Sequence, residues 1–241
     1  SAIADVNQAI NIAPNYALPH LILGVIHYNF GDTERAVSTF NKASQLLAAQ
    51  GNQSYAYASQ GLAFQVSTNY PAAINSYTKA IKANPKDAEI YDLRGDVYSR
   101  SGNIQKALAD YTQAIRINPN YASAYTSRAT IRFAQQQDSQ GALADLNKAL
   151  SLDPSQDKAY FFRSIIRIQQ KDQQRAEADI NNAIKYVVND ADRYMYKGIK
   201  SALQGNKPGA LDNLQKSANL YQLRGDKSSY NEVMKLIAMI K

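Results

Sequence analysis

The chain has 241 residues and no cysteine, which excludes disulfides, thiolate nucleophiles and thiolate metal sites. Its net charge is +7. The excess of positive charge is concentrated in residues 191–241, which contain nine Lys and Arg and four Asp and Glu. No apolar run approaches the roughly 18 to 20 residues that span a bilayer, and no signal peptide heads the sequence.

The first predicted element is a helix over about residues 2–12, with Ala2, Val6 and Ala9 at helical spacing and Pro14 closing it. The same pattern recurs later as the second helix of a two-helix module, but here no first helix precedes it. We therefore expect the chain to begin in the middle of a repeat, as a fragment of a longer protein.

A two-helix module follows and occurs six times. In residues 88–121 its apolar and small residues are Tyr91, Gly95 and Tyr98, then, after a Gly102-Asn103 break, Ala107, Tyr111, Ala114 and a closing Pro119. The alanine at 107 recurs, at intervals of 34 to 37 residues, as Ala2, Ala36, Ala73, Ala142, Ala176 and Ala210. A period this regular indicates a repeat array.

The order aromatic, Gly, aromatic, Ala, aromatic, Ala, Pro resembles the tetratricopeptide (TPR) repeat, in a bacterial-type array that covers nearly the whole chain. The resemblance implies an all-α, right-handed solenoid in a single domain, 1–241. Its parts would be a half repeat 1–16, repeats 17–53, 54–87, 88–121, 122–156, 157–190 and 191–225, and a capping helix 226–241. The Trp common at the first aromatic position is absent, replaced by His20, Tyr57, Tyr91, Tyr125, Tyr160 and Tyr194. Because a ring is kept, its packing role should survive.

Two further features belong to the elements themselves. The linker Ala48–Gln53 carries a three-residue insertion and lacks Pro, which predicts the loosest joint of the array. At the end of the chain, Tyr230, Val233, Ile237 and Ile240 give the last predicted helix an apolar stripe, as a terminal cap requires.

No pattern in the sequence indicates catalysis, a metal or a cofactor. His20 and His27 are the only histidines, and they align with ring positions that pack each helix pair. The mid-helix glycines share one register with Ala129 and Ser164, which indicates a need for small size rather than a phosphate loop. We therefore expect a protein that is not an enzyme.

Arginine and aspartate vary together between modules. Asp110, Asp145 and Asp179 follow Arg94, Arg128 and Arg163 by sixteen to seventeen residues, while modules with a neutral residue in the first register have Thr39 or Ser76 in the second. The arginines could instead track a phosphate backbone, but this covariation favours a structural ion pair within each module.

The resemblance further implies that the first helix of each module lines an inner surface that binds a peptide or protein segment. The predicted groove residues are Asp92, Asp96, Thr126, Thr130, Phe133, Phe161, Ile165, Ile168, Met195 and Ile199. The same registers elsewhere carry Leu21, Val25, Tyr28, Ala58, Leu62, Gln65, Ser99 and Ala202. Apolar anchors would set affinity, and the two aspartates would orient a Lys or Arg of the ligand.

Two alternatives stay open. The basic C-terminal end could dock on nucleic acid or an anionic membrane surface, although neither partner is favoured. The array could also be the recognition arm of a larger enzyme. Docking of an acidic C-terminus, known for chaperone-binding TPR domains, is disfavoured because Leu21, Val25, Asp92 and Asp96 occupy the registers that would need Lys and Asn.

Overall fold

The structure is a computed structural model that describes residues 2–240, and every regular element in these residues is an α-helix. The helices are α1 (Ala2–Ile12), α2 (Ala17–Asn29), α3 (Thr33–Ala49), α4 (Gln53–Val66), α5 (Tyr70–Ala83), α6 (Ala88–Arg100), α7 (Ile104–Ile117), α8 (Ala122–Gln136), α9 (Ser139–Leu152), α10 (Asp157–Gln169), α11 (Gln173–Tyr186), α12 (Asp190–Leu203), α13 (Lys207–Leu223) and α14 (Lys227–Ile240). The first helix has the predicted bounds, residues 2–12. The predicted all-α array of tandem helix pairs is confirmed.

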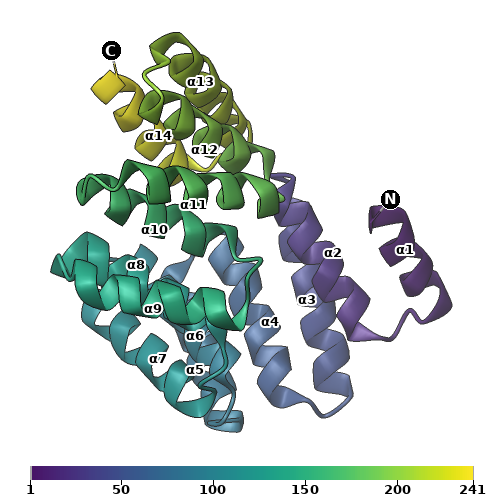
Figure 1. The fold of residues 1–241 in the computed structure, drawn as a ribbon. Helices are drawn as coiled ribbons and strands as arrows, with labels where there is room; N and C mark the ends of the chain where they lie inside the picture. Colours follow the sequence, from purple (N-terminus) through teal and green to yellow (C-terminus); the bar gives the residue numbers. More distant parts are fainter. Residues whose placement is uncertain (1, 241) are drawn as a thin grey trace. The chain divides into compact units, whose positions relative to one another are not determined.

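The helices form two compact units, residues 1–127 and residues 128–241, with the division inside α8. Within each unit, helices that follow one another in sequence pack side by side (Figure 1). The first unit holds α1 to α7 and the start of α8, and the second holds the rest of α8 and α9 to α14. The single-domain organisation and the handedness of the array stay predictions.

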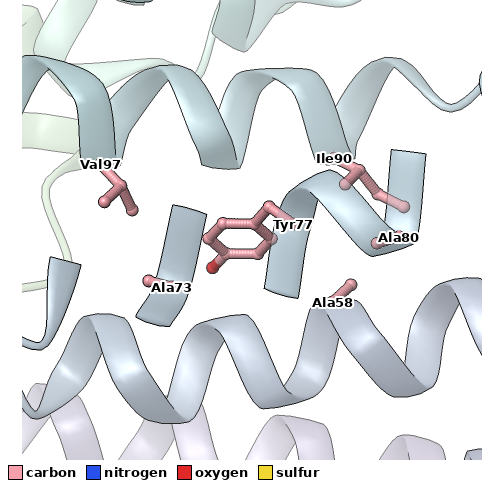
Figure 2. Close-up of a cluster of buried hydrophobic side chains, with 6 residues drawn as sticks. All are labelled: Ala58, Ala73, Tyr77, Ala80, Ile90 and Val97. Carbon is pink, nitrogen blue, oxygen red and sulfur yellow. The ribbon is translucent and has the colours of Figure 1, made fainter. Parts of the chain in front are cut away.

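The core of the first unit is built around the aromatic residue on the second helix of each pair. Tyr77 on α5 is fully buried between Ala58 of α4 and Ile90 and Val97 of α6 (Figure 2). Its hydroxyl donates to Gln65 Oε1 at 2.8 Å, so the polar tip of the ring is satisfied. Burying an apolar side chain of this size contributes roughly 1.5 to 3 kcal/mol to the stability of the fold. Because the Tyr77 ring packs against both α4 and α6, it holds two successive helix pairs together.

In the first unit the small residue in the middle of each first helix faces that aromatic, whereas Gly198 in the second unit faces Leu214. A Cβ added to Gly24, Gly61 or Gly95 would lie 2.6 Å from the ring of Phe40, Tyr77 or Tyr111 respectively. Where the small residue is Ala129 or Ser164, the fully buried partner register holds Leu146 or Ile180 instead of a ring. The predicted steric reason for this glycine register is therefore confirmed.

Turns between the two helices of a pair place one residue in the left-handed region. Gly31, Gly102 and Gly205 occupy this position with φ between 73° and 79°, whereas Thr68 (57°) and Lys171 (61°) adopt it without being glycine. A left-handed residue lets the chain end one helix and start the next within three residues.

The insertion after the first pair lengthens a helix. α3 runs for 17 residues to Ala49, against 14 for α5, so that only Gln50 to Asn52 lie between α3 and α4. Gly51 has φ 77°, and Asn52 N–H donates to the Leu47 carbonyl at 2.9 Å, as Asn103 does to Tyr98 at 2.8 Å. The joint is thus a tight turn shorter than the expected linker. Low protection of this linker against hydrogen exchange stays a prediction.

The last helix covers the end of the second unit as predicted. Val233 and Ile237 of α14 are buried against Leu214, Ala218 and Tyr221 of α13, with Tyr230 and Ile240 packed partly against the same cluster. This apolar stripe is what a terminal helix needs to close a stack of repeats.

Candidate functional site

The three arginines that vary together with aspartate form ion pairs within their helix pairs. Arg94 lies 2.8 Å from Asp110, and Arg128 and Arg163 lie 2.7 Å from Asp145 and Asp179. Each guanidinium donates to both carboxylate oxygens. The bidentate geometry and buried aspartates make these strong, directional pairs. The predicted pairing is confirmed, and the phosphate-tracking alternative loses its three best cations.

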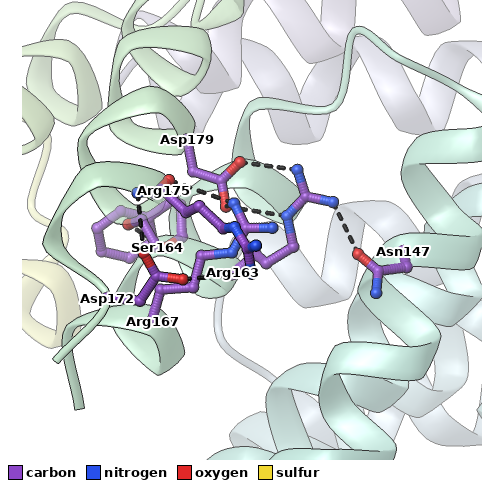
Figure 3. Close-up of polar contacts among 8 residues, drawn as sticks. Asn147, Arg163, Ser164, Arg167, Asp172, Arg175 and Asp179 are labelled. Atoms are coloured by element: carbon purple, nitrogen blue, oxygen red, sulfur yellow. Dashed lines mark hydrogen bonds and ion pairs between the residues drawn. The ribbon is translucent and has the colours of Figure 1, made fainter. Parts of the chain in front are cut away.

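Two of these arginines also join successive repeats, which the sequence analysis missed. Arg94 Nη1 donates to Thr78 Oγ1 at 3.1 Å, and Arg163 Nη1 donates to Asn147 Oδ1 at 2.8 Å (Figure 3). In both cases the acceptor lies on the second helix of the preceding pair, sixteen residues before the arginine. A polar acceptor recurring at that spacing is the signal that could have revealed the contact.

A second arginine contacts two of the aspartates. Arg132 Nη1 lies 2.7 Å from Asp145 Oδ2, and Arg167 Nη1 lies 2.6 Å from Asp179 Oδ2 (Figure 3). The sequence analysis did not include these two arginines. They sit one helical turn after Arg128 and Arg163, a spacing that places both cations on the face of the helix that meets the aspartate.

The acidic pair of the predicted groove lies in the first unit. Asp92 is 5% exposed, and its Oδ2 accepts from Ser123 Oγ at 2.9 Å, while Oδ1 is buried without a hydrogen-bond partner. Asp96 is half-buried and accepts from the Tyr111 hydroxyl at 2.8 Å. Burial, helped by the charge of Asp96, raises the pKa of Asp92 to about 7.

The threonines and the phenylalanine on α8 have different exposures. Thr126, in the first unit, is buried, whereas Thr130 and Phe133, in the second, are half-buried. A buried hydroxyl contributes little to an open surface, so Thr130 and Phe133 are the better candidates for ligand contact.

The remaining predicted groove residues come together in the second unit. Phe161, Ile165, Ile168 and Met195 are half-buried and pack against one cluster that includes the buried Ile199. Phe161 stacks on Tyr196 with ring centroids 4.6 Å apart. The four half-buried side chains therefore pack partly between repeats and are partly exposed at the surface.

Four exposed apolar side chains lie on α2. Leu18, Ile22, Val25 and Tyr28 are 44% to 49% exposed, and α2 contains no charged residue. Val25 and Tyr28 are at registers expected to line the inner surface, but Leu18 and Ile22 were not. An apolar stripe at helical spacing with these exposures is a typical docking surface.

The basic end of the chain has partners for several of its cations. Lys216 pairs with Asp212 at 2.8 Å, Arg193 pairs with Asp190, and the Lys197 ammonium lies 5.6 Å from the centre of the Tyr194 ring. Each of these three cations therefore already interacts with a neighbouring side chain.

Other functional classes gain no support from the described part of the chain. Among residues 2–240, no group of three or more His, Cys, Asp and Glu could hold a metal ion. None of the described helices is both long enough and apolar enough to cross a membrane. The His20 ring is buried, with Nε2 3.2 Å from the Pro14 carbonyl, as expected for a packing residue.

Two family models match the chain. One described as TPR repeat matches residues 68–102 and 95–136, and one described as tetratricopeptide repeat matches residues 129–194, so that together they cover more than half of the sequence. No curated protein matches the chain in sequence.

Solved structures share the fold. A chain of the APC/C hetero-tetramer Cut9-Hcn1 matches with a TM-score of 0.74 at 15% identity, covering 99% of this chain and 45% of that one. Yeast Tom70 matches with a TM-score of 0.66 at 16% identity, over 86% and 43%, and Pseudomonas aeruginosa pilF with 0.62 at 15%, over 98% and 99%. The chain thus spans less than half of the Tom70 and Cut9-Hcn1 structures. Identities this low concern the fold alone.

Proposed function

Because the chain belongs to the tetratricopeptide repeat family, we propose that it is a non-catalytic scaffold that binds a peptide or protein segment during assembly of a complex. Folds of this family typically bind proteins or peptides, and stacked helix pairs offer an extended surface for such a ligand. One observation carries the proposal: the first helices of several pairs keep large apolar side chains at the surface, outside the positions that pack the pair.

Two stretches of this apolar surface are the candidate contacts. In the second unit they are Phe161, Ile165, Ile168 and Met195, and in the first unit the stripe on α2. Burying one such anchor contributes roughly 1.5 to 3 kcal/mol, against about 0 to 1 kcal/mol for an exposed ion pair. The apolar contacts should therefore set affinity, while Asp92 and Asp96 set the orientation of the ligand.

The experiment starts from a random peptide library selected on the purified chain. The selected peptide is then titrated against Ile165→Ala, Ile168→Ala and Val25→Ala, with Val188→Ala as the matched control because Val188 is exposed outside these surfaces. Circular dichroism checks that each variant is folded. We expect at least one apolar truncation to weaken binding roughly tenfold or more, as loss of about 1.4 kcal/mol implies, and the control to leave it unchanged.

Salt dependence separates this surface from the basic C-terminal end. Binding through apolar contacts should change little between low and moderate salt, whereas docking on phosphate-rich nucleic acid or membrane should weaken steeply. Unchanged affinity in every folded apolar variant, together with a steep salt response, would overturn the proposal in favour of the basic end.

A further inference from the structure

The second helices of the first unit carry positive charge on one face. This face is defined by three positions relative to the buried alanines Ala36, Ala73 and Ala107: one residue before the alanine, six residues after it and nine residues after it. In α3, α5 and α7 these positions hold six Lys and Arg, all exposed, and no Asp or Glu. The cations of this outer basic face are Arg35, Lys42, Lys79, Lys82, Lys106 and Arg116.

The outer basic face points away from the core. On α5 the residues Ala73, Tyr77 and Ala80 are buried, whereas Lys79 and Lys82 are exposed. Steps of seven and three residues return to nearly the same side of a helix, so the three positions form a row about 15 Å long. Equivalent positions in successive repeats face similar directions, because each repeat is related to the next by the same small rotation. The rows of α3, α5 and α7 therefore belong to one surface.

Few acidic groups offset this charge. The only acids of α3, α5 and α7 are Glu34 and Asp110, and Asp110 is buried against Arg94. Arg35 pairs with Asp32 at 3.3 Å, whereas the other five cations of the face form no ion pair with a described residue. Ordinary surfaces mix charges of both signs, and a face with one sign attracts a partner of the opposite sign.

The charge belongs to the second helices and not to the whole surface. In the first unit, α2 and α4 contain no Lys, Arg, Asp or Glu, and α6 contains three acids and two arginines. In the second unit, the same three positions of α9, α11 and α13 again hold no acid. Ten of the eighteen positions in the six pairs are thus Lys or Arg. The four in the second unit are Lys148, Arg175, Lys185 and Lys216.

The chemistry of the outer basic face fits an anionic membrane better than a nucleic acid. Four of its six cations are lysines, which act as point charges and suit a surface of many mobile anionic headgroups. No large apolar or aromatic side chain is exposed on the described residues of α3, α5 and α7. The face therefore offers no ring on which a base could stack. Its charge is also spread across three helices, whereas a single nucleic-acid strand follows a line.

We propose that the outer basic face docks on a membrane surface that contains anionic lipids, through contacts of its lysines and arginines with the headgroups. This interaction goes beyond the proposed function, because the candidate peptide contacts lie on first helices and leave the second helices open. Each cation near such a surface strengthens binding roughly fivefold, so several weak contacts add up to stable docking. Salt should weaken docking steeply, since it screens every one of these contacts.

The test is sedimentation of the whole chain with vesicles of equal parts phosphatidylcholine and phosphatidylserine. We expect binding to these vesicles at low salt, and none to vesicles of phosphatidylcholine alone. The triple variant Lys42→Gln, Lys79→Gln, Lys82→Gln should weaken binding roughly hundredfold, as three fivefold losses imply. Circular dichroism checks that the variant is folded. Absence of binding to the mixed vesicles would overturn the proposal.

A matched control removes the same charge elsewhere. The triple variant Lys200→Gln, Lys227→Gln, Lys235→Gln changes the basic C-terminal end and should affect vesicle binding far less. Equal losses in the two triple variants would mean that net charge alone attracts the chain, and a larger loss in the control would assign docking to the C-terminal end. Either result would overturn the proposal. So would binding to duplex DNA that depends on the outer basic face while the vesicles stay unbound.

Discussion

At the residue scale, the unpaired carboxyl of Asp92 should make stability depend on pH. Its pKa is about 7 in the folded chain, against 3.8 for an ordinary aspartate. Between these values the folded state binds the proton more tightly than the unfolded state does. The free energy of unfolding should therefore decrease as pH rises from about 4 to about 7, then level off.

Replacing this carboxyl tests the dependence. Asp92→Asn should make the slope between pH 4 and 7 shallower and raise the free energy of unfolding above pH 7 by on the order of 1 to 3 kcal/mol, since one pKa unit is about 1.4 kcal/mol. Urea unfolding at several pH values measures it, with the exposed Asp5→Asn as control. Burial also raises the pKa of Asp192, so a background slope of the same sign remains. Parallel curves for wild type and Asp92→Asn would contradict the assignment.

At the same scale, the arginine pairs and Asp92 show which features could be predicted from the sequence and which could not. Arg94 and Asp110 could be paired in advance because charge disappears from both registers together in other repeats, where Gln60 instead accepts from Ser76 at 3.3 Å. The burial of Asp92 could not be predicted, because an aspartate found at this register in one repeat shows no covariation with a partner. Its neighbour Ser123 also lies on another helix pair. Burial depends on packing between repeats, which a single register does not encode.

At the scale of the helix pair, the small residue and its facing ring should behave as one unit. Gly61→Ala puts a methyl group 2.6 Å from the Tyr77 ring and should destabilise the chain by roughly 1 to 3 kcal/mol. Adding Tyr77→Leu should recover part of this loss, because the pair with Ala129 carries Leu146 in that register. Chemical denaturation of both single variants and the double variant measures the coupling. Simple additivity of the two losses would show that the register is not a steric pair.

The turns within pairs give a second prediction at this scale. Thr68 is held at φ 57°, a left-handed conformation that is unfavourable for a β-branched residue, where other pairs use glycine. Thr68→Gly should stabilise the chain by about 1 kcal/mol, and Gly102→Thr at the same turn position should destabilise it by a similar amount. Thermal unfolding compares the two. Lower stability in Thr68→Gly would mean that contacts of the threonine side chain outweigh the backbone strain.

Across the whole molecule, the helices were predictable because the same pattern of apolar and small residues recurs in six repeats. Comparing six copies removes most of the ambiguity that a single repeat would leave. The surface was less predictable. Leu18 and Ile22 of α2 are exposed, whereas Ile199, expected at the ligand surface, is buried beneath neighbouring helices. Registers show which face of a helix a residue is on, but the depth of burial depends on how far the next helix covers that face.

A destabilising substitution should affect mainly the helices that lie near it. Leu214 of α13 is fully buried and packs in a cluster drawn from α12, α13 and α14 only. Leu214→Ala should cost about 2 to 5 kcal/mol in that cluster, because a cavity remains where the side chain was. In a repeat array each module contacts only its neighbours, so hydrogen exchange should quicken in α12 to α14 while α2 to α5 keep their protection. Tyr77→Ala should produce the reverse pattern, with α4 to α6 exposed and α12 to α14 unaffected. Equal loss of protection in both units from either variant would mean that the chain unfolds as one cooperative body, and the nearest-neighbour description of its stability would fail.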